Sequence, residues 1–201
     1  MSKDLKNIIK VILLGNSGTG KTSLINVYEG NQFSNDTLST FGSQYINKQL
    51  IINEETYNVH IWDTAGQEQF RSMNKIFIKG SNIVIFVYDI TDKISFNDLS
   101  DFWVDYVDKI LGKDIIIGVI GNKVDLFENI EINKKEGKKY ADDIGAFFIE
   151  TSAKEDPDGF NNFVNQLVNE YISHFKDNFP ENDRISLVSH NSNNSRSGGC
   201  C

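Results

Sequence analysis

A glycine-rich segment near the start of the chain has the residue types and spacing to bind phosphate. Residues 15–22 have the sequence GNSGTGKT and fit the pattern G-x-x-x-x-G-K-[ST], between an apolar run and a segment that can continue as a helix. The glycines would let successive backbone N–H groups point at an anion, and a helix beginning near Gly20 would add its positive end. Lys21 would reach the β- and γ-phosphates, and the Thr22 hydroxyl would hold Mg²⁺. The segment predicts a phosphate loop; the alternative is a plain turn with a surface lysine.

Residues 63–67 (DTAGQ) form a second segment that could take part in phosphate chemistry. Asp63, at the end of a predicted strand near a phosphate loop, could hold Mg²⁺ through a water molecule. Gly66 would let a backbone N–H approach the terminal phosphate, and Gln67 could orient an attacking water. The alternative is a turn in which Asp63 only caps the backbone.

Residues 122–125 (NKVD) could select a base. The Asp125 carboxylate can accept two hydrogen bonds in one plane, which matches the N1–H and 2-amino groups of guanine. Adenine lacks this pair of donors, so Asp125 would favour guanine. The motif is short, and its position after a buried apolar run favours base binding over a helix cap or an ordinary loop aspartate.

Alternating strands and helices would have to position these segments. Apolar runs, two of them joined by a hairpin turn at residues 53–55, predict strands at residues 8–14, 45–52, 56–62, 83–88, 115–120 and 147–149. Helical spacing and capping signals predict helices after Gly20, from Ser95 as N-cap to residue 111, at residues 133–144, and from Asp156 and Pro157 to residue 175. We interpret residues 31–44 as a loop anchored by Phe33, and the segment up to Gly80 that follows Gln67 as a polar connection.

This alternation predicts a mostly parallel sheet covered by helices on both faces. All candidate segments, including residues 152–154, follow the ends of predicted strands, and ligands bind at that edge in open α/β sheets. We expect a short N-terminal extension over residues 1–7, one domain over residues 8–176 and a disordered tail over residues 177–201. The tail is rich in Ser and Asn and has too few apolar residues to form a core.

Composition narrows the class of protein. The net charge of −8 argues against a nucleic-acid partner, and no apolar run is long enough to span a bilayer. The start of the chain lacks a signal-peptide core, and Ser2 in place of glycine excludes N-myristoylation. Cys200 and Cys201 are the only cysteines and the last two residues, so neither can crosslink a core. We therefore expect an intracellular protein.

Taken in order, the motifs resemble those of the small GTPases of the Ras superfamily, and most closely those of its Rab branch. The similarity runs from about Ile8 to Phe175. It implies the Ras-like G domain of P-loop NTPases, an α/β fold with a mostly parallel six-stranded sheet, one antiparallel strand and helices on both faces. It also implies a GTP/GDP switch that hydrolyses GTP and recruits effectors to membranes in vesicle trafficking.

The resemblance also implies the residues of the site. Thr40 would be the switch I threonine that reaches Mg²⁺ and the γ-phosphate, and Thr22 and Asp63 would complete the metal ligands. Gln67 and Lys21 would be catalytic. The nucleotide contacts would come from Gly15, Asn16, Ser17, Gly18, Thr19, Gly20, Lys21, Thr22, Ser23, Phe33, Ser39, Thr40, Gly66, Asn122, Lys123, Asp125, Ser152, Ala153 and Lys154.

Three finer assignments come from the same resemblance. Phe33 would lie against the edge of the guanine. The Ala153 N–H would reach guanine O6, with Lys154 beside it. Ser17 and Ser39 would add hydroxyl contacts to the γ-phosphate.

Features at the end and in the middle of the chain favour the Rab branch. The last four residues, GGCC, resemble a double-cysteine prenylation signal, so Cys200 and Cys201 would carry geranylgeranyl groups that together give stable anchoring. Tyr45, Trp62 and Phe77 would supply the aromatic patch that Rab effectors contact, with core packing as the alternative for Trp62. Residues 40–45 (TFGSQY) depart from the TIGVDF of most Rab proteins, which leaves the subfamily and the compartment unassigned.

The implied partners act on the nucleotide state and on the membrane. They are a guanine-nucleotide exchange factor, a GTPase-activating protein, effectors, a Rab escort protein and a GDP-dissociation inhibitor, at the cytoplasmic side of intracellular membranes with cycling through the cytosol. The only arginines are Arg71, Arg184 and Arg196, none an evident internal arginine finger, so the activating protein would supply one. The alternatives are a scaffold that binds GTP but hardly cleaves it, a P-loop kinase or ATPase, and a Ras-type signalling protein with one lipid at the plasma membrane.

Overall fold

The structure, a computed structural model, describes residues 7–35, 40, 43–64, 71–112 and 115–175 of the 201-residue chain. The predictions for most of the N-terminal extension and for the tail concern residues outside these ranges. The predictions for five single residues also lie outside them: Ser39, Gly66, Gln67, Cys200 and Cys201.

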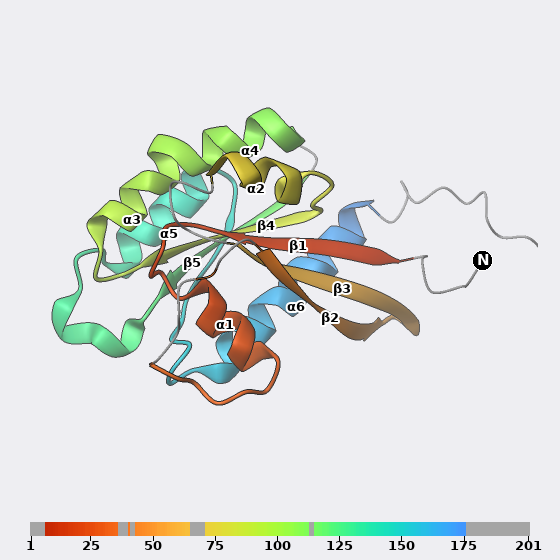
Figure 1. Cartoon of the computed structure of the whole chain (residues 1–201), viewed down its shortest axis with the longest axis horizontal. Helices are drawn as coiled ribbons and strands as arrows, with labels where there is room; N and C mark the ends of the chain where they lie inside the picture. The colour runs from red at the N-terminus through yellow and green to blue at the C-terminus, as the bar shows by residue number, and fades with distance from the viewer. Residues whose placement is uncertain (1–6, 36–39, 41–42, 65–70, 113–114, 176–201) are drawn as a thin grey trace, which may run out of the picture.

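A six-stranded sheet forms the centre of the fold (Figure 1). The strand order is β2-β3-β1-β4-β5-β6. β2 runs antiparallel to β3, and all other neighbouring pairs are parallel, which confirms the predicted sheet. The strands are β1 (Ile8–Leu14), β2 (Ser43–Ile52), β3 (Glu55–Thr64), β4 (Ile83–Asp89), β5 (Ile116–Asn122) and β6 (Phe147–Glu150).

Helices cover both faces of the sheet, as predicted (Figure 1). On one face, α1 and α6 contribute Leu24 and Phe160 to a buried cluster. On the other face, Ile78, Trp103 and Ala141 join a second cluster. Within the described residues, no helix has both the length and the apolar character needed to cross a membrane. The helical elements are α1 (Lys21–Tyr28), α2 (Arg71–Ile78), α3 (Lys93–Asp98), the π-helical η3 (Leu99–Trp103), α4 (Val104–Leu111), the 3₁₀-helical η4 (Val124–Asn129), α5 (Lys134–Asp143) and α6 (Pro157–Phe175).

The side chains of β1 alternate between the two clusters. Ile9, Val11 and Leu13 pack on the side of α1 and α6, whereas Ile12 and Leu14 pack on the opposite side. All five are fully buried, and each such side chain contributes roughly 1.5–3 kcal/mol through the hydrophobic effect. The loop that follows β1 therefore starts from one of the most firmly held strands in the molecule.

Residues 71–78 were expected to be part of a polar connection, and this prediction is wrong because they form α2. Ile78 at the end of the helix is fully buried. The Lys10 ammonium on β1 donates to the carbonyl oxygens of Phe77 and Lys79, at 2.5 and 2.9 Å. A cation at these carbonyl groups satisfies the C-terminus of the helix. Both contacts are tertiary, so the local sequence does not indicate them.

Several predicted element boundaries also differ from the structure, and two of them have a clear physical cause. The helix expected to begin with Ser95 as its cap begins at Lys93, because the Asp92 carboxylate accepts the Ile94 N–H and takes the capping position. The Ser95 hydroxyl is instead buried and donates to the Asp92 carbonyl oxygen. Strand β3 does not end before residue 63, because pairing with β2 continues to Thr64.

Candidate functional site

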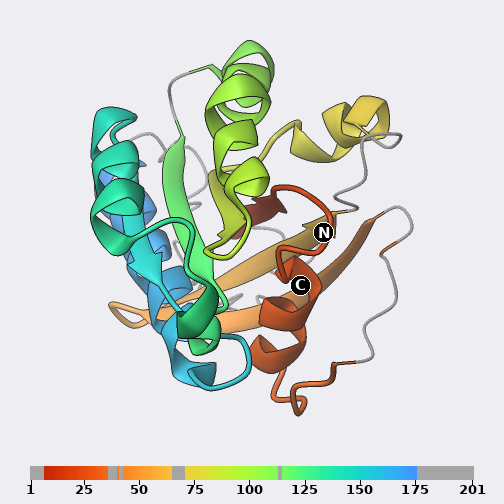
Figure 2. The same cartoon turned by 90° about the vertical axis from the view of Figure 1, so that its left-hand side faces the viewer.

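A pocket of about 390 Å³ opens at the edge of the sheet where the parallel strands end. Figure 2 views this edge, with the red loop after β1 leading into α1. The lining comes from the predicted phosphate loop, from the segment after α1, and from the loops after β5 and β6. The lining residues are Ser17, Gly18, Gly20, Lys21, Thr22, Ser23, Phe33, Ser34, Asn35, Thr40, Thr64, Asn122, Lys123, Asp125, Leu126, Ala153 and Lys154.

Two glycines allow the phosphate loop to pass close to neighbouring strands. Gly15 and Gly20 have φ values of 143° and 90°, which side chains rarely adopt. A Cβ at Gly15 would collide with the Val87 carbonyl oxygen, and a Cβ at Gly20 would collide with the Asn122 amide. The spacing of the glycines in the motif is therefore fixed by strands β4 and β5 as well as by the loop itself.

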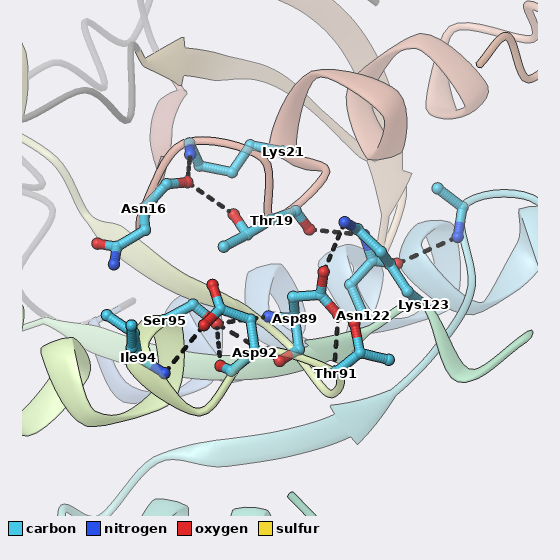
Figure 3. A network of polar contacts seen from close by, with 11 residues as sticks. Asn16, Thr19, Lys21, Asp89, Thr91, Asp92, Ile94, Ser95, Asn122 and Lys123 are labelled. Atoms are coloured by element: carbon cyan, nitrogen blue, oxygen red, sulfur yellow. Dashed lines mark hydrogen bonds and ion pairs between the residues drawn. The ribbon is translucent and has the colours of Figure 1, made fainter. Parts of the chain in front are cut away.

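Lys21 brings a buried positive charge to the pocket. Its ammonium donates to the Gly15 carbonyl oxygen at 2.9 Å and to the Asn16 carbonyl oxygen at 2.6 Å. Figure 3 shows the contact with Asn16. Burial lowers the pKa of Lys21 to about 8, and the negative charge of Asp63 only partly offsets this effect. Within the described residues, the ammonium contacts carbonyl groups rather than a carboxylate, so a bound anion would stabilise it.

Three oxygen-bearing side chains meet beside this lysine. The Thr22 hydroxyl lies 2.7 Å from Asp63 Oδ2 and 2.7 Å from the Thr40 hydroxyl, which is itself 3.3 Å from Asp63 Oδ2. Asp63 Oδ1 is buried and has no hydrogen-bond partner among the described residues. Burial raises the pKa of Asp63, and the hydrogen bond from Thr22 and the charge of Lys21 oppose this. A set of hydroxyl and carboxylate oxygens with one unused oxygen fits the preferences of Mg²⁺.

At the opposite end of the pocket, the Asn122 side chain connects three segments. Its amide nitrogen donates to the Thr19 carbonyl oxygen at 2.9 Å, and its amide oxygen accepts the Ala153 N–H at 3.2 Å (Figure 3). Asn122 is almost completely buried. It therefore holds the phosphate loop, the end of β5 and the loop after β6 together.

The Asp125 carboxylate is fixed by the loop after β6. Ser152 donates its hydroxyl to Asp125 Oδ1 at 2.5 Å, and the Lys154 ammonium lies 4.0 Å from Asp125 Oδ2. The same Ser152 hydroxyl accepts the backbone N–H groups of Lys154 and Glu155. This arrangement presents a carboxylate at the pocket wall, as recognition of a base with two adjacent donors would require.

Comparison with known proteins places this arrangement in a family. The sequence model described as Ras family matches residues 10–173. Rab-1 of Theileria parva is 37% identical over 154 residues, which cover 77% of this chain and 70% of that protein. The chain belongs to the Rab branch of the Ras superfamily of small GTPases. Rab-21 of Bos taurus and of Homo sapiens are 41% and 40% identical over 146 residues, 73% of this chain. The matched region spans 65% and 64% of those two proteins.

The pocket of this Rab-branch GTPase brings together most of the predicted nucleotide contacts. Gly15, Asn16, Thr19 and Ser152 do not line it and instead support the residues that do. Sequence analysis missed four lining residues. Each lies within two residues of a predicted site residue, so its position along the chain was the available signal: Ser34, Asn35, Thr64 and Leu126.

Outside the pocket, the three predicted patch aromatics of this Rab-branch protein form a stack. The Tyr45 and Trp62 rings lie 5.0 Å apart at 22°, and Trp62 and Phe77 lie 5.9 Å apart. Tyr45 is 54% exposed, whereas Trp62 and Phe77 are half-buried. The Lys10 ammonium lies 4.8 Å from the Trp62 ring centre. Trp62 thus packs against its neighbours and remains partly exposed, and its role as an effector contact stays a prediction.

Proposed function

We propose that this Rab-branch GTPase binds GTP and GDP in the pocket described above, uses Mg²⁺, and switches its partner-binding surface when GTP is hydrolysed. The observation that carries the proposal is the corner formed by Lys21, Thr22, Thr40 and Asp63. There, a buried cation lies beside a buried carboxylate oxygen that has no partner among the described residues. A phosphate chain would stabilise the cation, and a metal ion would use the oxygens.

The residues of the chain would divide the hydrolytic work. Mg²⁺, held by Thr22, Thr40 and, through water, Asp63, would supply positive charge to the phosphate oxygens. Water attacks the γ-phosphorus in line as the bond from this phosphorus to the bridging oxygen breaks, so that GDP leaves and inorganic phosphate forms. Gln67 orients the water, while Lys21 and the loop N–H groups stabilise the charge that develops. Loss of the γ-phosphate releases Thr40 and changes the surface offered to partners.

Intrinsic hydrolysis should be slow, because a needed positive charge is missing from the chain. We expect an activating protein to supply an arginine, as no internal arginine finger is evident among the three arginines of the sequence. Intrinsic turnover as fast as that of enzymes with a built-in arginine finger would contradict this expectation.

Base selection provides the test of the nucleotide site. Asp125→Asn replaces one carboxylate oxygen with an NH₂ donor, so the side chain can no longer accept from both the N1–H and the 2-amino group of guanine. It suits xanthine instead, which has a carbonyl oxygen in place of the 2-amino group. GDP binding should therefore weaken and xanthosine diphosphate binding should improve, measured by calorimetric titration. Asp158→Asn, at an exposed position in the first turn of α6 outside the pocket, is the matched control. Unchanged preference in Asp125→Asn would overturn the proposed base site.

Membrane attachment would complete the cycle. We propose that Cys200 and Cys201 carry two geranylgeranyl groups, added with a Rab escort protein and shielded in the cytosol by a GDP-dissociation inhibitor. The lipids would hold the protein at the cytoplasmic side of intracellular membranes, where an exchange factor and effectors act, the latter on Tyr45, Trp62 and Phe77. Mass spectrometry of the C-terminus from cells should find two prenyl groups; an unmodified end would contradict the proposal, and a single group would favour a Ras-type anchor.

A further inference from the structure

Asp89 has no role in the site as described so far, although it lies next to a residue that lines the pocket. It is the last residue of β4, and it pairs in register with Asn122, the last residue of β5. This register places the Asp89 side chain beside Lys123 (Figure 3). Asp89 is only 7% exposed. A carboxylate buried to this degree needs partners, and its partners indicate what it does.

The two oxygens of the Asp89 carboxylate have different partners. Oδ1 accepts the backbone N–H of Thr91 at 2.9 Å and the Thr91 hydroxyl at 2.7 Å. Oδ2 lies 2.5 Å from the Lys123 ammonium. The two bonds from Thr91 fix the plane of the carboxylate, so that Oδ2 is directed at the lysine. The ion pair is therefore oriented from the side of Asp89 rather than formed by two mobile surface chains.

Lys123 is held in a conformation that needs support. Its φ and ψ angles are 71° and 37°, in the left-handed region that residues with a side chain seldom occupy. Such conformations persist when surrounding contacts fix them, and they are common at binding sites. Lys123 lines the pocket while its ammonium binds Asp89. The methylene groups of the side chain are thus available as an apolar wall for a flat ligand, with the charge held at its edge.

We propose that Asp89, oriented by Thr91, is a positioning residue for the nucleotide base: it anchors the Lys123 ammonium and so holds the lysine stem as one wall of the base site. The inference rests on the proposed nucleotide site. It differs from a purely structural role, in which the ion pair would only join β4 to η4 and would stabilise the fold without affecting the ligand.

The test is the rate at which the full-length protein, loaded with a fluorescent GDP analogue in excess Mg²⁺, releases it when unlabelled GDP is added. Asp89→Asn keeps the shape but loses the charge, and release should become about tenfold faster, since hydrogen bonds to charged groups are among the stronger ones. Lys123→Met should give an effect of similar size. The double variant should release no faster than the faster single variant, because Asp89 acts through Lys123.

Asp92→Asn is the matched control, because this aspartate also accepts a backbone N–H in the same segment but lies outside the pocket. It should release the analogue at the wild-type rate even if its melting temperature falls.

The inference is overturned if Asp89→Asn lowers the melting temperature and leaves release unchanged, or if its effect multiplies in full with that of Lys123→Met. If Asp89→Asn does not fold, Thr91→Val decides: release at the wild-type rate overturns the inference, and faster release that disappears in the Lys123→Met background supports it. A wild-type protein that failed to hold GDP would contradict the proposed function itself.

Discussion

The two ends of the pocket differ in how their polar groups are satisfied. At the base end, the Asn122 amide bonds to the Thr19 carbonyl oxygen and the Ala153 N–H, and Asp125 accepts the Ser152 hydroxyl. At the phosphate end, the Lys21 ammonium rests on carbonyl groups of its own loop, and Asp63 Oδ1 has no partner among the described residues.

This difference distinguishes polar groups that are paired within the protein from polar groups that a ligand would have to pair. The base end is held together by protein groups alone and should keep its shape in any nucleotide state. The phosphate end contains charges whose burial is unfavourable in the protein alone, and the proposed phosphate and Mg²⁺ ligands would stabilise them. Such a division suits a switch. The phosphate groups are the part of the nucleotide that differs between GTP and GDP, and they would bind at the end whose charges the protein alone does not fully stabilise.

The largest effect should come from Lys21→Met at the phosphate end. GDP binding should weaken by about 100-fold, because the ammonium would make charge-assisted hydrogen bonds to the phosphates. The ligand-free protein should be no less stable, because a poorly paired buried charge is removed. Calorimetric titration and urea unfolding of the ligand-free protein measure the two quantities.

Lys10→Met is the matched control for this substitution. Like Lys21, Lys10 donates to two carbonyl oxygens, but it lies half-buried on β1 and outside the pocket. Its loss should leave GDP affinity unchanged. If Lys21→Met bound GDP as tightly as the wild type, or if it destabilised the ligand-free protein, the contrast between the two ends would be lost.

Unlike Lys21→Met, Asn122→Ala should destabilise the ligand-free protein. Its free energy of unfolding should fall by about 2 kcal/mol, because the Thr19 carbonyl oxygen and the Ala153 N–H lose their hydrogen-bond partners. Urea unfolding of the ligand-free protein measures it, and GDP release should also be faster. Asn82→Ala is the control, since the Asn82 amide similarly joins β1 to Tyr171 of α6 away from the pocket. Asn82→Ala should lower stability without changing release. An Asn122→Ala variant of wild-type stability would show that the base end is not self-supporting.

A smaller effect, roughly 1.5 kcal/mol between pH 8 and pH 9.5, should appear in the stability of the ligand-free protein. Burial lowers the folded-state pKa of Lys21 to about 8 from 10.5, so between these values the unfolded chain binds more protons than the folded one. Stability should therefore rise as the pH increases through this window, and the rise should vanish in Lys21→Met and in the GDP-bound protein. Urea unfolding at the two pH values measures it. Burial raises the pKa of Tyr28 to about 12 from 10.0, and tyrosines that titrate near pH 10 in the unfolded chain begin to lower stability at the top of this window, so the Lys21 effect is the difference between the wild type and Lys21→Met. A rise of equal size in Lys21→Met would assign it to other groups.

The parts of the site that could be predicted from the sequence are local. The glycine pattern of residues 15–22 and the apolar run before it lie within one stretch of chain, and the structure has β1, the loop and α1 in that order. Asn122 and Asp125 likewise lie at the end of, and just after, a strand that a single run of apolar residues indicates. The six strands could be predicted because β1, β4 and β5 are largely buried and β3 is buried on one face, whereas β2 and β6 are half-buried at most and carry apolar residues that pack against the core.

The parts that could not be predicted depend on contacts between distant segments. Helix α2 ends on the ammonium of Lys10, which lies 67 residues from Phe77 in the chain, and no local pattern indicates this contact. Ser95 suits a helix cap, but it is buried, and Asp92 takes that position. The pairing of Asp89 with Lys123 requires the register of β4 against β5, which no local pattern specifies.

Single-turnover hydrolysis by the purified protein tests the central claim most directly. GTP and ATP would be compared side by side, with and without Mg²⁺, and with Gln67→Leu as the control. The account predicts slow, Mg²⁺-dependent cleavage of GTP alone, impaired in Gln67→Leu. Tight GTP binding with no cleavage beyond that of the control would contradict it, and the protein would then be a nucleotide-locked scaffold.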